Sequence, residues 1–228
     1  MKLALLGHGI SHSLSPSLYR ELLGDKLESY ELLDIEDSRL IPGLPSLAEK
    51  YDGLSITSPH KRHFFHDVVI TSPIVNEIKA INTISFRKSG IYGTNTDVSA
   101  VEQILLRLKK EYGDLHMVVL GSGVMARVTL LVAKALQIPY EQYSRKKGDD
   151  VAQLDLSAKR ASQTIVINCC ARDFVFQGKL HPDLIFWDYN YAFLPHQTTL
   201  PSQVKSYMDG QEMLRLQAIA ALEFWSDT

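Results

Sequence analysis

A glycine turn between an apolar run and a helical pattern constrains the fold more than any other feature of the chain. Residues 116–120 read HMVVL, residues 121–126 follow at once as GSGVMA, and a helical pattern continues to residue 138. Between a strand and a helix, this spacing permits a tight turn and a close approach of a pyrophosphate to the backbone. The pattern predicts a Rossmann-like unit, with an ordinary tight turn as the alternative. The residues expected to contact the dinucleotide are Gly121, Ser122, Gly123, Val124, Met125 and Ala126.

The second strand expected in this unit ends in cations, where an NAD site usually has a carboxylate. Residues 143–147 read YSRKK. A guanidinium binds phosphate through two parallel hydrogen bonds, so Ser144, Arg145 and Lys146 are expected to hold a ribose 2′-phosphate. The turn therefore favours NADP over NAD as the cofactor, although charge runs are more often plain solvated faces.

Composition limits the functions that the chain can have. Its 228 residues carry a net charge of −2, which gives no general attraction to nucleic acid or membranes. Cys169 and Cys170 are adjacent, so they neither close a loop nor have the spacing of a metal site. With no signal-peptide core and no apolar stretch long enough to span a bilayer, we expect a cytoplasmic protein.

Short apolar runs alternate with helical patterns along the chain, which favours an α/β fold. Strands are expected at residues 2–10, 30–36, 53–57, 164–170 and 184–191, with a hairpin at 81–95. Helices are expected at residues 15–27, with Ser15 as N-cap, around residues 63–69, and at residues 212–225.

Several polar residues follow the expected strands, and each has an ordinary explanation when taken alone. Lys61 comes shortly after the strand at 53–57, where a lysine is more often a surface residue. Asp97 follows the hairpin and is equally well placed to cap the next helix. Ser15 fits a plain helix cap.

Nine stretches along the chain are informative as a set: HSLSP, SITSPHK, AINTI, GTNTD, GSGVMAR, YSRKK, INCC, DYNY and DGQEMLRLQA. Taken together, they resemble motifs of the shikimate dehydrogenase family and occur in that family's order. The resemblance implies a reversible, NADP-dependent reduction of 3-dehydroshikimate to shikimate, a step of aromatic amino acid biosynthesis. It also implies that Lys61 and Asp97 are the catalytic pair. The substrate-binding residues that it implies are Ser13, Ser15, Thr57, Asn82, Tyr191 and Gln217.

The same resemblance implies two domains. Residues 1–97 plus 210–228 would form an α/β substrate-binding and catalytic domain, to which the C-terminal helix returns. Residues 98–209 would form the Rossmann-like NADP-binding domain. The expected partner is a small-molecule substrate, without nucleic acid, membrane or metal, in a monomer or homodimer.

The chemistry of ketone reduction fits the implied pair. Reducing a ketone needs a hydride donor and a proton source at the developing alkoxide. An ammonium beside a carboxylate can donate that proton or stabilise the charge. Asp97 would then keep Lys61 oriented.

The chain departs from the family pattern at several positions. Ser55 stands where asparagine is usual, and Val124 and Met125 leave less room in the phosphate turn. Cys169-Cys170 replaces Ala-Thr, and a buried pair of this kind is more often apolar packing than redox chemistry.

The second half of the chain is also short for the family. Ser144 and Asn168 are only 24 positions apart, so the nucleotide domain is expected to be trimmed. These departures leave two alternatives open. One is a paralogue that acts on quinate or another cyclohexane carboxylate, and the other is a non-catalytic NADP-binding sensor.

Overall fold

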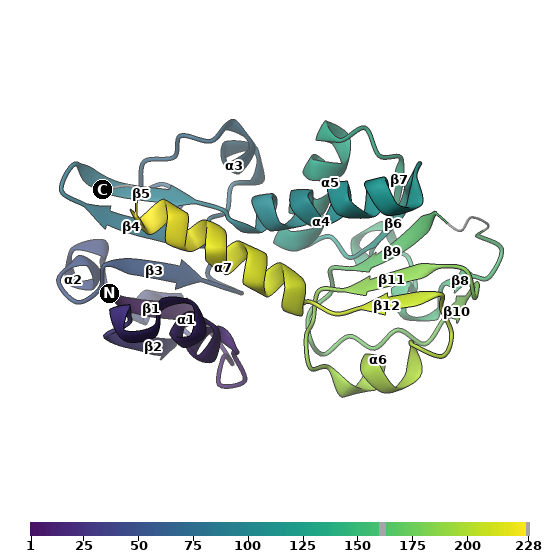
Figure 1. Ribbon diagram of the computed structural model, residues 1–228, viewed down its shortest axis with the longest axis horizontal. Helices are drawn as coiled ribbons and strands as arrows, with labels where there is room; N and C mark the ends of the chain where they lie inside the picture. Colours follow the sequence, from purple (N-terminus) through teal and green to yellow (C-terminus); the bar gives the residue numbers. More distant parts are fainter. Residues whose placement is uncertain (160–162, 227–228) are drawn as a thin grey trace. The chain divides into compact units, whose positions relative to one another are not determined.

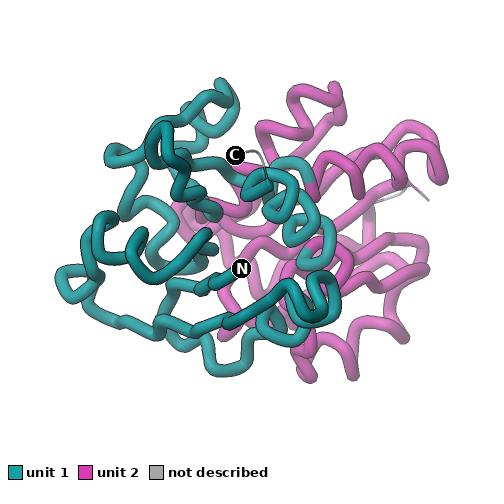
Figure 2. Tube along the Cα trace, turned by 60° about the vertical axis from the view of Figure 1, so that its left-hand side comes forward, with its two compact units in different colours: residues 1–99, 214–228 teal, residues 100–213 magenta. Residues whose placement is uncertain are grey.

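The computed structural model describes residues 1–159 and 163–226 and divides into two compact units (Figure 2). Unit 1 comprises residues 1–99 and 214–228, and unit 2 comprises residues 100–213. Each unit contains a sheet with parallel strands and helices, so the expected α/β class is confirmed. The sequence placed the divisions at residues 97 and 210, and the roles expected of the two units stay predictions.

Unit 1 contains a five-stranded sheet in the order β2-β1-β3-β4-β5 (Figure 1). Strand β1 is parallel to β2 and β3, whereas β4 is antiparallel to β3 and forms the expected hairpin with β5. The strands are β1 (Lys2–Gly7), β2 (Ser29–Asp34), β3 (Gly53–Ile56), β4 (Thr83–Arg87) and β5 (Gly90–Thr94).

Strand β1 is buried on both faces, which explains its continuous apolar run. Leu3 packs with Tyr19 and with the C-terminal helix on one face. Ala4 and Leu6 contribute to a second cluster on the other face, because side chains alternate along a strand. The helices involved are α1 (Ser15–Leu23), α2 (Leu44–Ala48), α3 (Pro73–Ile78) and α7 (Gln211–Ser226), and short 3-10 turns form at η1 (Gly24–Lys26) and η2 (Ser38–Leu40).

The C-terminal helix α7 returns to unit 1, as expected. The indole N–H of Trp225 donates a hydrogen bond to the carbonyl of Ile84, at 2.8 Å. The same indole lies directly over Gly53, where a β-carbon would come within 2.5 Å of the ring nitrogen. Glycine at this point of β3 therefore makes room for the helix.

The helix expected around residues 63–69 does not form. The chain there makes separate turns instead, with the N–H of His63 bonded to the carbonyl of His60 at 2.8 Å. The prediction was wrong for a tertiary reason. Phe64 and Phe65 both reach the core, and the N–H of Val69 donates to the carbonyl of Ile91 in β5 at 2.9 Å, which extends the chain.

Unit 2 contains a five-stranded, wholly parallel sheet in the order β12-β11-β9-β6-β7. The strands are β6 (His116–Leu120), β7 (Tyr140–Tyr143), β9 (Thr164–Asn168), β11 (Ile185–Asp188) and β12 (Ser206–Met208). The helices are α4 (Asp97–Tyr112), α5 (Val124–Ala135) and α6 (Leu194–Thr199). The inner strands β9 and β11 are buried along their whole length, and β6 is buried except at His116, as a parallel sheet covered on both faces requires.

The connection from β7 to β9 contains little regular secondary structure in its described residues. Its described residues form two 3-10 turns, η3 (Arg145–Lys147) and η4 (Val151–Gln153), and the short strand β8 (Asp155–Leu156). Strand β8 pairs with β10 (Lys179–Leu180) in a separate two-stranded sheet, so β7 is an edge strand. No helix in the described part of the chain has both the length and the apolar character needed to cross a bilayer.

Candidate active site

The polar residues expected to bind substrate in unit 1 follow strands that end at one edge of the sheet. Strands β1, β2 and β3 run in parallel, so their carboxyl ends meet there. Because β4 is antiparallel to β3 and β5 to β4, the start of β4 and the end of β5 lie at the same edge. Ligands of open α/β sheets bind at the carboxyl ends of the parallel strands.

Lys61 and Asp97 meet at this edge although 36 positions separate them in the chain. The ammonium Nζ of Lys61 lies 2.6 Å from Oδ2 of Asp97, and the two side chains are 12 % and 8 % exposed. A charge this far removed from water is tolerated only beside an opposite charge, because its desolvation is costly. The pair therefore holds an oriented ammonium at a place that still reaches the surface.

The backbone holds each member of the pair in place. The carbonyl of Lys61 accepts a hydrogen bond from the N–H of Ile81 at 2.7 Å, which ties the turn to the start of β4. Asp97 is the first residue of α4, and its N–H donates to Oδ1 of Asn95 at 3.2 Å. Neither side chain depends on its partner alone for its position.

Asn82 and Gln217 belong to a hydrogen-bond network at the same edge. Oδ1 of Asn82 accepts the N–H of Thr96 at 2.8 Å, and its Nδ2 donates to Oγ1 of Thr96 at 3.1 Å. The Thr96 hydroxyl lies 3.3 Å from Oε1 of Gln217. Through Thr96, the C-terminal helix is joined to the end of β5.

The loop after β1 carries the two serines and leads into helix α1. The N-cap of this helix differs from the expected Ser15. Helix α1 begins at Ser15, so Ser15 is its first residue and Leu14 precedes it. Oγ of Ser13 accepts the N–H of Ser15 at 3.2 Å, which satisfies a donor that the helix start leaves open. Ser13, not Ser15, therefore provides the side-chain oxygen at this helix start.

Asp34 and Thr57 position this loop. The Asp34 carboxylate accepts the N–H groups of Gly9 at 2.8 Å and Ile10 at 3.1 Å, and these bonds, that of Gly9 first, hold its pKa below the usual value. The methyl of Thr57 lies so close to Gly7 that a β-carbon there would come within 2.5 Å of it. Both contacts bring the serine loop against the ends of β2 and β3.

The glycine turn of unit 2 has the geometry that a pyrophosphate needs. Gly121 has a φ of +110°, which favours glycine, and a β-carbon there would lie 3.3 Å from the backbone of Cys169. A β-carbon at Gly123 would meet no atom within 4 Å, so the backbone is open there. Helix α5 begins at Val124, directly after Gly123, and its unpaired N–H groups suit a phosphate. Ala126 is fully buried against the sheet, whereas Ser122 and Met125 are partly exposed.

The basic turn after β7 fits a phosphate as well. Ser144 is 2 % exposed, and its Oγ has no hydrogen-bond partner among the described residues. Arg145 and Lys146 are exposed. An unsatisfied buried hydroxyl beside two accessible cations suits a group that brings acceptor oxygens. Unit 2 thus provides fitting contacts for both ends of a phosphorylated adenosine.

Comparison with known proteins adds evidence of another kind. The family profile for the shikimate dehydrogenase substrate binding domain matches residues 5–84. A shikimate dehydrogenase (NADP(+)) of Synechocystis is 27 % identical over 260 aligned positions, which cover 98 % of this chain and 89 % of that protein. The chain is thus similar to a shikimate dehydrogenase along almost its whole length.

Shikimate dehydrogenases of other organisms match this chain over different lengths. The enzyme of Ignicoccus hospitalis is 34 % identical over 137 residues, which are 59 % of this chain and 52 % of the relative. The chain thus spans about half the length of this curated relative in the alignment. Among solved structures, shikimate dehydrogenase from Aquifex aeolicus has a TM-score of 0.77 at 21 % identity, covering 100 % of this chain and 93 % of the other. Shikimate 5-dehydrogenase from Thermus thermophilus in complex with shikimate has a TM-score of 0.76 at 23 % identity, with the same coverage. These likenesses show the fold.

Two buried residues of the hydrogen-bond network in unit 1 were missed by the sequence analysis. Thr96 connects Asn82 to Gln217, and Asn95 donates from Nδ2 to the carbonyl of Ala80 at 3.1 Å. The two are only 5 % and 3 % exposed. A signal was present, because both lie inside the stretch GTNTD that also contains Asp97.

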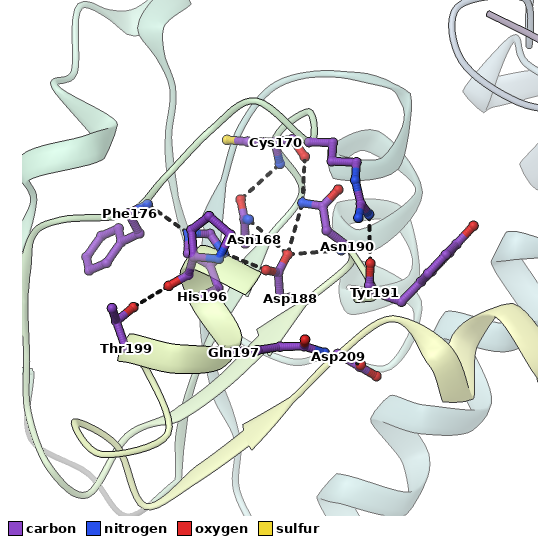
Figure 3. A network of polar contacts seen from close by, with 12 residues as sticks. Asn168, Cys170, Phe176, Asp188, Asn190, Tyr191, His196, Gln197, Thr199 and Asp209 are labelled. Atoms are coloured by element: carbon purple, nitrogen blue, oxygen red, sulfur yellow. Dashed lines mark hydrogen bonds and ion pairs between the residues drawn. The ribbon is translucent and has the colours of Figure 1, made fainter. Parts of the chain in front are cut away.

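Tyr191 belongs to unit 2, whereas the other residues expected to bind substrate belong to unit 1. It follows β11 in unit 2, and its carbonyl accepts a hydrogen bond from the Arg172 guanidinium at 2.7 Å. Figure 3 shows its ring extending away from the polar network around Asp188. Its role in substrate binding stays a prediction.

A second buried pair, which no sequence pattern indicated, occupies the carboxyl ends of β9 and β11 in unit 2 (Figure 3). Nδ1 of His196 lies 2.5 Å from Oδ2 of Asp188, and neither side chain is exposed. Nε2 of His196 accepts the N–H of Phe176 at 2.8 Å, so the ring proton is on Nδ1. Oδ1 of Asp188 accepts from Asn168 at 3.0 Å and from the N–H of Asn190 at 2.9 Å. The pair ties together the loops that follow both strands.

The neighbouring cysteines have unreactive thiols. Burial raises the pKa of Cys170 to about 11 and raises that of Cys169 well above its usual value. A thiol must lose its proton to act as a nucleophile, so both are poor nucleophiles at neutral pH. Packing beside the glycine turn is the better description of the pair.

Proposed function

We propose that the chain is an NADP-dependent shikimate dehydrogenase that reversibly reduces 3-dehydroshikimate to shikimate. The observation that carries the proposal is the Lys61–Asp97 contact of 2.6 Å at the sheet edge where ligands of α/β proteins bind. Support comes from relatives named shikimate dehydrogenase (NADP(+)) and from a Thermus thermophilus structure titled as a complex with NADP(H) and shikimate. In this proposal unit 1 binds the substrate and unit 2 binds the dinucleotide.

Lys61 would provide the proton of the reaction. When bound, NADPH supplies the hydride that turns the ketone carbon into an alkoxide carbon. The Lys61 ammonium then donates a proton to the alkoxide oxygen and regains one from solvent. Asp97 accepts a hydrogen bond from the Lys61 ammonium at 2.6 Å and so fixes the direction of its N–H bonds.

The remaining residues of the edge would bind and orient the cyclic acid. Hydroxyls of Ser13 and Ser15, together with Tyr191, would hold the carboxylate. Thr57, Asn82 and Gln217 would contact the ring hydroxyls. Hydrogen bonds between Thr96 and both Asn82 and Gln217 hold these two side chains in place. A rigid set of donors of this kind lowers the barrier by orientation.

The cofactor contacts follow from the fit of unit 2. The backbone of residues 121–126 would hold the pyrophosphate, and Ser144, Arg145 and Lys146 would hold the 2′-phosphate. Cytoplasmic location and a monomeric or homodimeric state remain predictions, and light scattering on the purified chain would measure the latter.

A turnover assay tests the proposed function. The chain is mixed with shikimate or quinate and with NADP or NAD, and absorbance of the reduced nicotinamide is followed. We expect it to rise fastest with shikimate and NADP. Faster turnover of quinate would assign the chain to the paralogue activity, and silence with every cyclohexane acid would favour the NADP-binding sensor.

A further inference from the structure

The turn that carries Arg145 and Lys146 is closed by Asp149, a carboxylate that the sequence analysis did not consider. Oδ2 of Asp149 accepts the N–H of Ser144 at 2.7 Å, and the N–H of Asp149 reaches the carbonyl of Ser144 at 3.3 Å. Gly148 has a φ of +84°, which lets the chain reverse there. The carboxylate is thereby brought back to the end of β7.

The end of β7 is the position that selects the ribose in a Rossmann-like unit. The N–H of Gly121 donates to the carbonyl of Tyr143 at 2.8 Å, so Ser144 directly follows a residue bonded to the glycine turn. A carboxylate at this point accepts a hydrogen bond from the ribose 2′-hydroxyl of NAD, and an arginine accommodates the 2′-phosphate of NADP. The fold therefore places a carboxylate and two cations at the end of β7. In the sequence, only the cations directly follow this strand.

The charges around the turn balance more evenly than the run of cations indicates. Of the three cations, Lys147 turns its ammonium back to the carbonyl of Gln142 at 3.1 Å. Arg145 and Lys146 remain for a phosphate, and the Asp149 carboxylate lies at the same turn, where it accepts the N–H of Ser144. A 2′-phosphate bound by this turn would be repelled by the Asp149 carboxylate, because both are negatively charged. This repulsion weakens the preference for NADP over NAD.

We propose that Asp149 is a specificity-determining residue, whose carboxylate at the end of β7 lets the chain bind NAD as well as NADP. The inference rests on the proposed function, since it assumes that unit 2 binds a dinucleotide. The inference identifies a residue that opposes the preference of Arg145 and Lys146 for a 2′-phosphate. It also adds NAD as a second cofactor.

Calorimetry with two cofactor fragments tests this without catalysis. Adenosine 2′,5′-bisphosphate and 5′-AMP differ only in the 2′-phosphate, so the ratio of their affinities reports the selection. For the wild-type chain we expect a preference of about tenfold or less for the bisphosphate. Asp149→Asn keeps an oxygen that can accept from Ser144 and removes the charge, and should raise that preference about tenfold further.

Asp150→Asn is the matched control. It removes the same charge from the neighbouring residue, whose exposed side chain makes no capping hydrogen bond. It should change the affinity ratio by less than about twofold. The ratio of kcat/KM for NADP and NAD, measured with shikimate on the same three proteins, should move in the same direction.

The outcomes separate the inference from the proposal beneath it. A wild-type preference above about a thousandfold would overturn the role of Asp149. So would an Asp149→Asn ratio equal to that of wild type or of Asp150→Asn, which would make Asp149 only a structural latch of the turn. Failure of both fragments to bind wild type would instead remove the dinucleotide site, and the inference with it.

Discussion

Each unit holds a buried aspartate near the ends of its parallel strands, but the surroundings of the two carboxylates differ. Asp97 faces the Lys61 ammonium at 2.6 Å, and the aspartate and lysine side chains keep 8 % and 12 % of their surface exposed. Asp188 faces the imidazole of His196 at 2.5 Å, and neither side chain has any exposed surface. One pair reaches the surface and the other is enclosed.

The difference separates a candidate site from a structural network. Both oxygens of Asp188 already accept hydrogen bonds from His196, Asn168 and Asn190, so a ligand has no acceptor to complete there. An ion pair with part of its surface accessible can be completed by a polar substrate. We therefore expect the first pair to govern turnover and the second to govern stability.

Replacing Lys61 by alanine would test the first half of this comparison with the largest effect. Loss of the proton donor should lower kcat about a thousandfold, while calorimetry still detects shikimate binding. Lys50→Ala, at an exposed position of the same unit, serves as the control and should keep full activity. Wild-type turnover by the Lys61 variant would reduce Lys61 to an ordinary lysine.

Replacing His196 by alanine would test the second half. The Asp188 carboxylate would remain buried without its imidazole, and the free energy of unfolding in urea should fall by about 3–5 kcal/mol. His181→Ala, which removes a histidine paired to the largely exposed Asp183, should cost about 1 kcal/mol or less. An equal loss in the two variants would mean that the enclosed pair adds no special stability.

Arg145→Asp would test a contrast inside unit 2. The basic turn after β7 is expected to govern cofactor choice, whereas the Asp188–His196 pair is expected to govern stability. The exposed guanidinium is expected to hold the 2′-phosphate, so its reversal should shift the kcat/KM ratio of NADP to NAD about tenfold toward NAD. The free energy of unfolding should change by only about 0.5 kcal/mol. An unchanged ratio would place the contact with the 2′-phosphate on other residues.

The partly exposed ion cluster around Glu141 provides the smallest and most pH-dependent contrast with the buried pair. Hydrogen bonds from Lys159 first, and then from Tyr143 and His116, lower the pKa of Glu141 to about 2. A lowered pKa in the folded state gives stability that is complete above the unfolded value of about 4.3 and lost as the pH falls toward 2.

Glu141→Gln measures that contribution. Because the side chain is 37 % exposed, solvent screening limits the expected loss at pH 7 to about 0.5–1 kcal/mol. The difference between wild type and variant in urea unfolding should shrink between about pH 4 and pH 2. A difference that persists unchanged at pH 2 would rule out the ionised Glu141 as its source.

Local pattern predicted those parts of the fold in which neighbouring residues carry the information. The glycine turn at 121–126 lies between a strand and a helix, and the hairpin of β4 and β5 forms within residues 81–95, where it was expected. The helix expected at 63–69 failed because its side chains serve the core and its backbone serves β5, and neither demand is visible in a short window.

The candidate site was only partly accessible to sequence reasoning. Motif order indicated Lys61 and Asp97, and the structure brings them together; their catalytic role remains a prediction. Thr96 was overlooked although it lies in the same stretch as Asp97 and bonds both Asn82 and Gln217. Asp149 and the Asp188–His196 pair follow no spacing rule, because a reversal of the chain or a short helix brings each carboxylate to its partner.

The sequence by itself determined the α/β class, the glycine turn and the chemical types of the residues at the strand ends, because these depend on periodicity and on backbone freedom at single positions. Only the tertiary structure decided which of those residues touch. Strand pairing converts separations of tens of residues into hydrogen-bond distances, and a linear pattern contains no measure of that closure. For this reason the same chain could be read as basic at the end of β7 and yet place a carboxylate there.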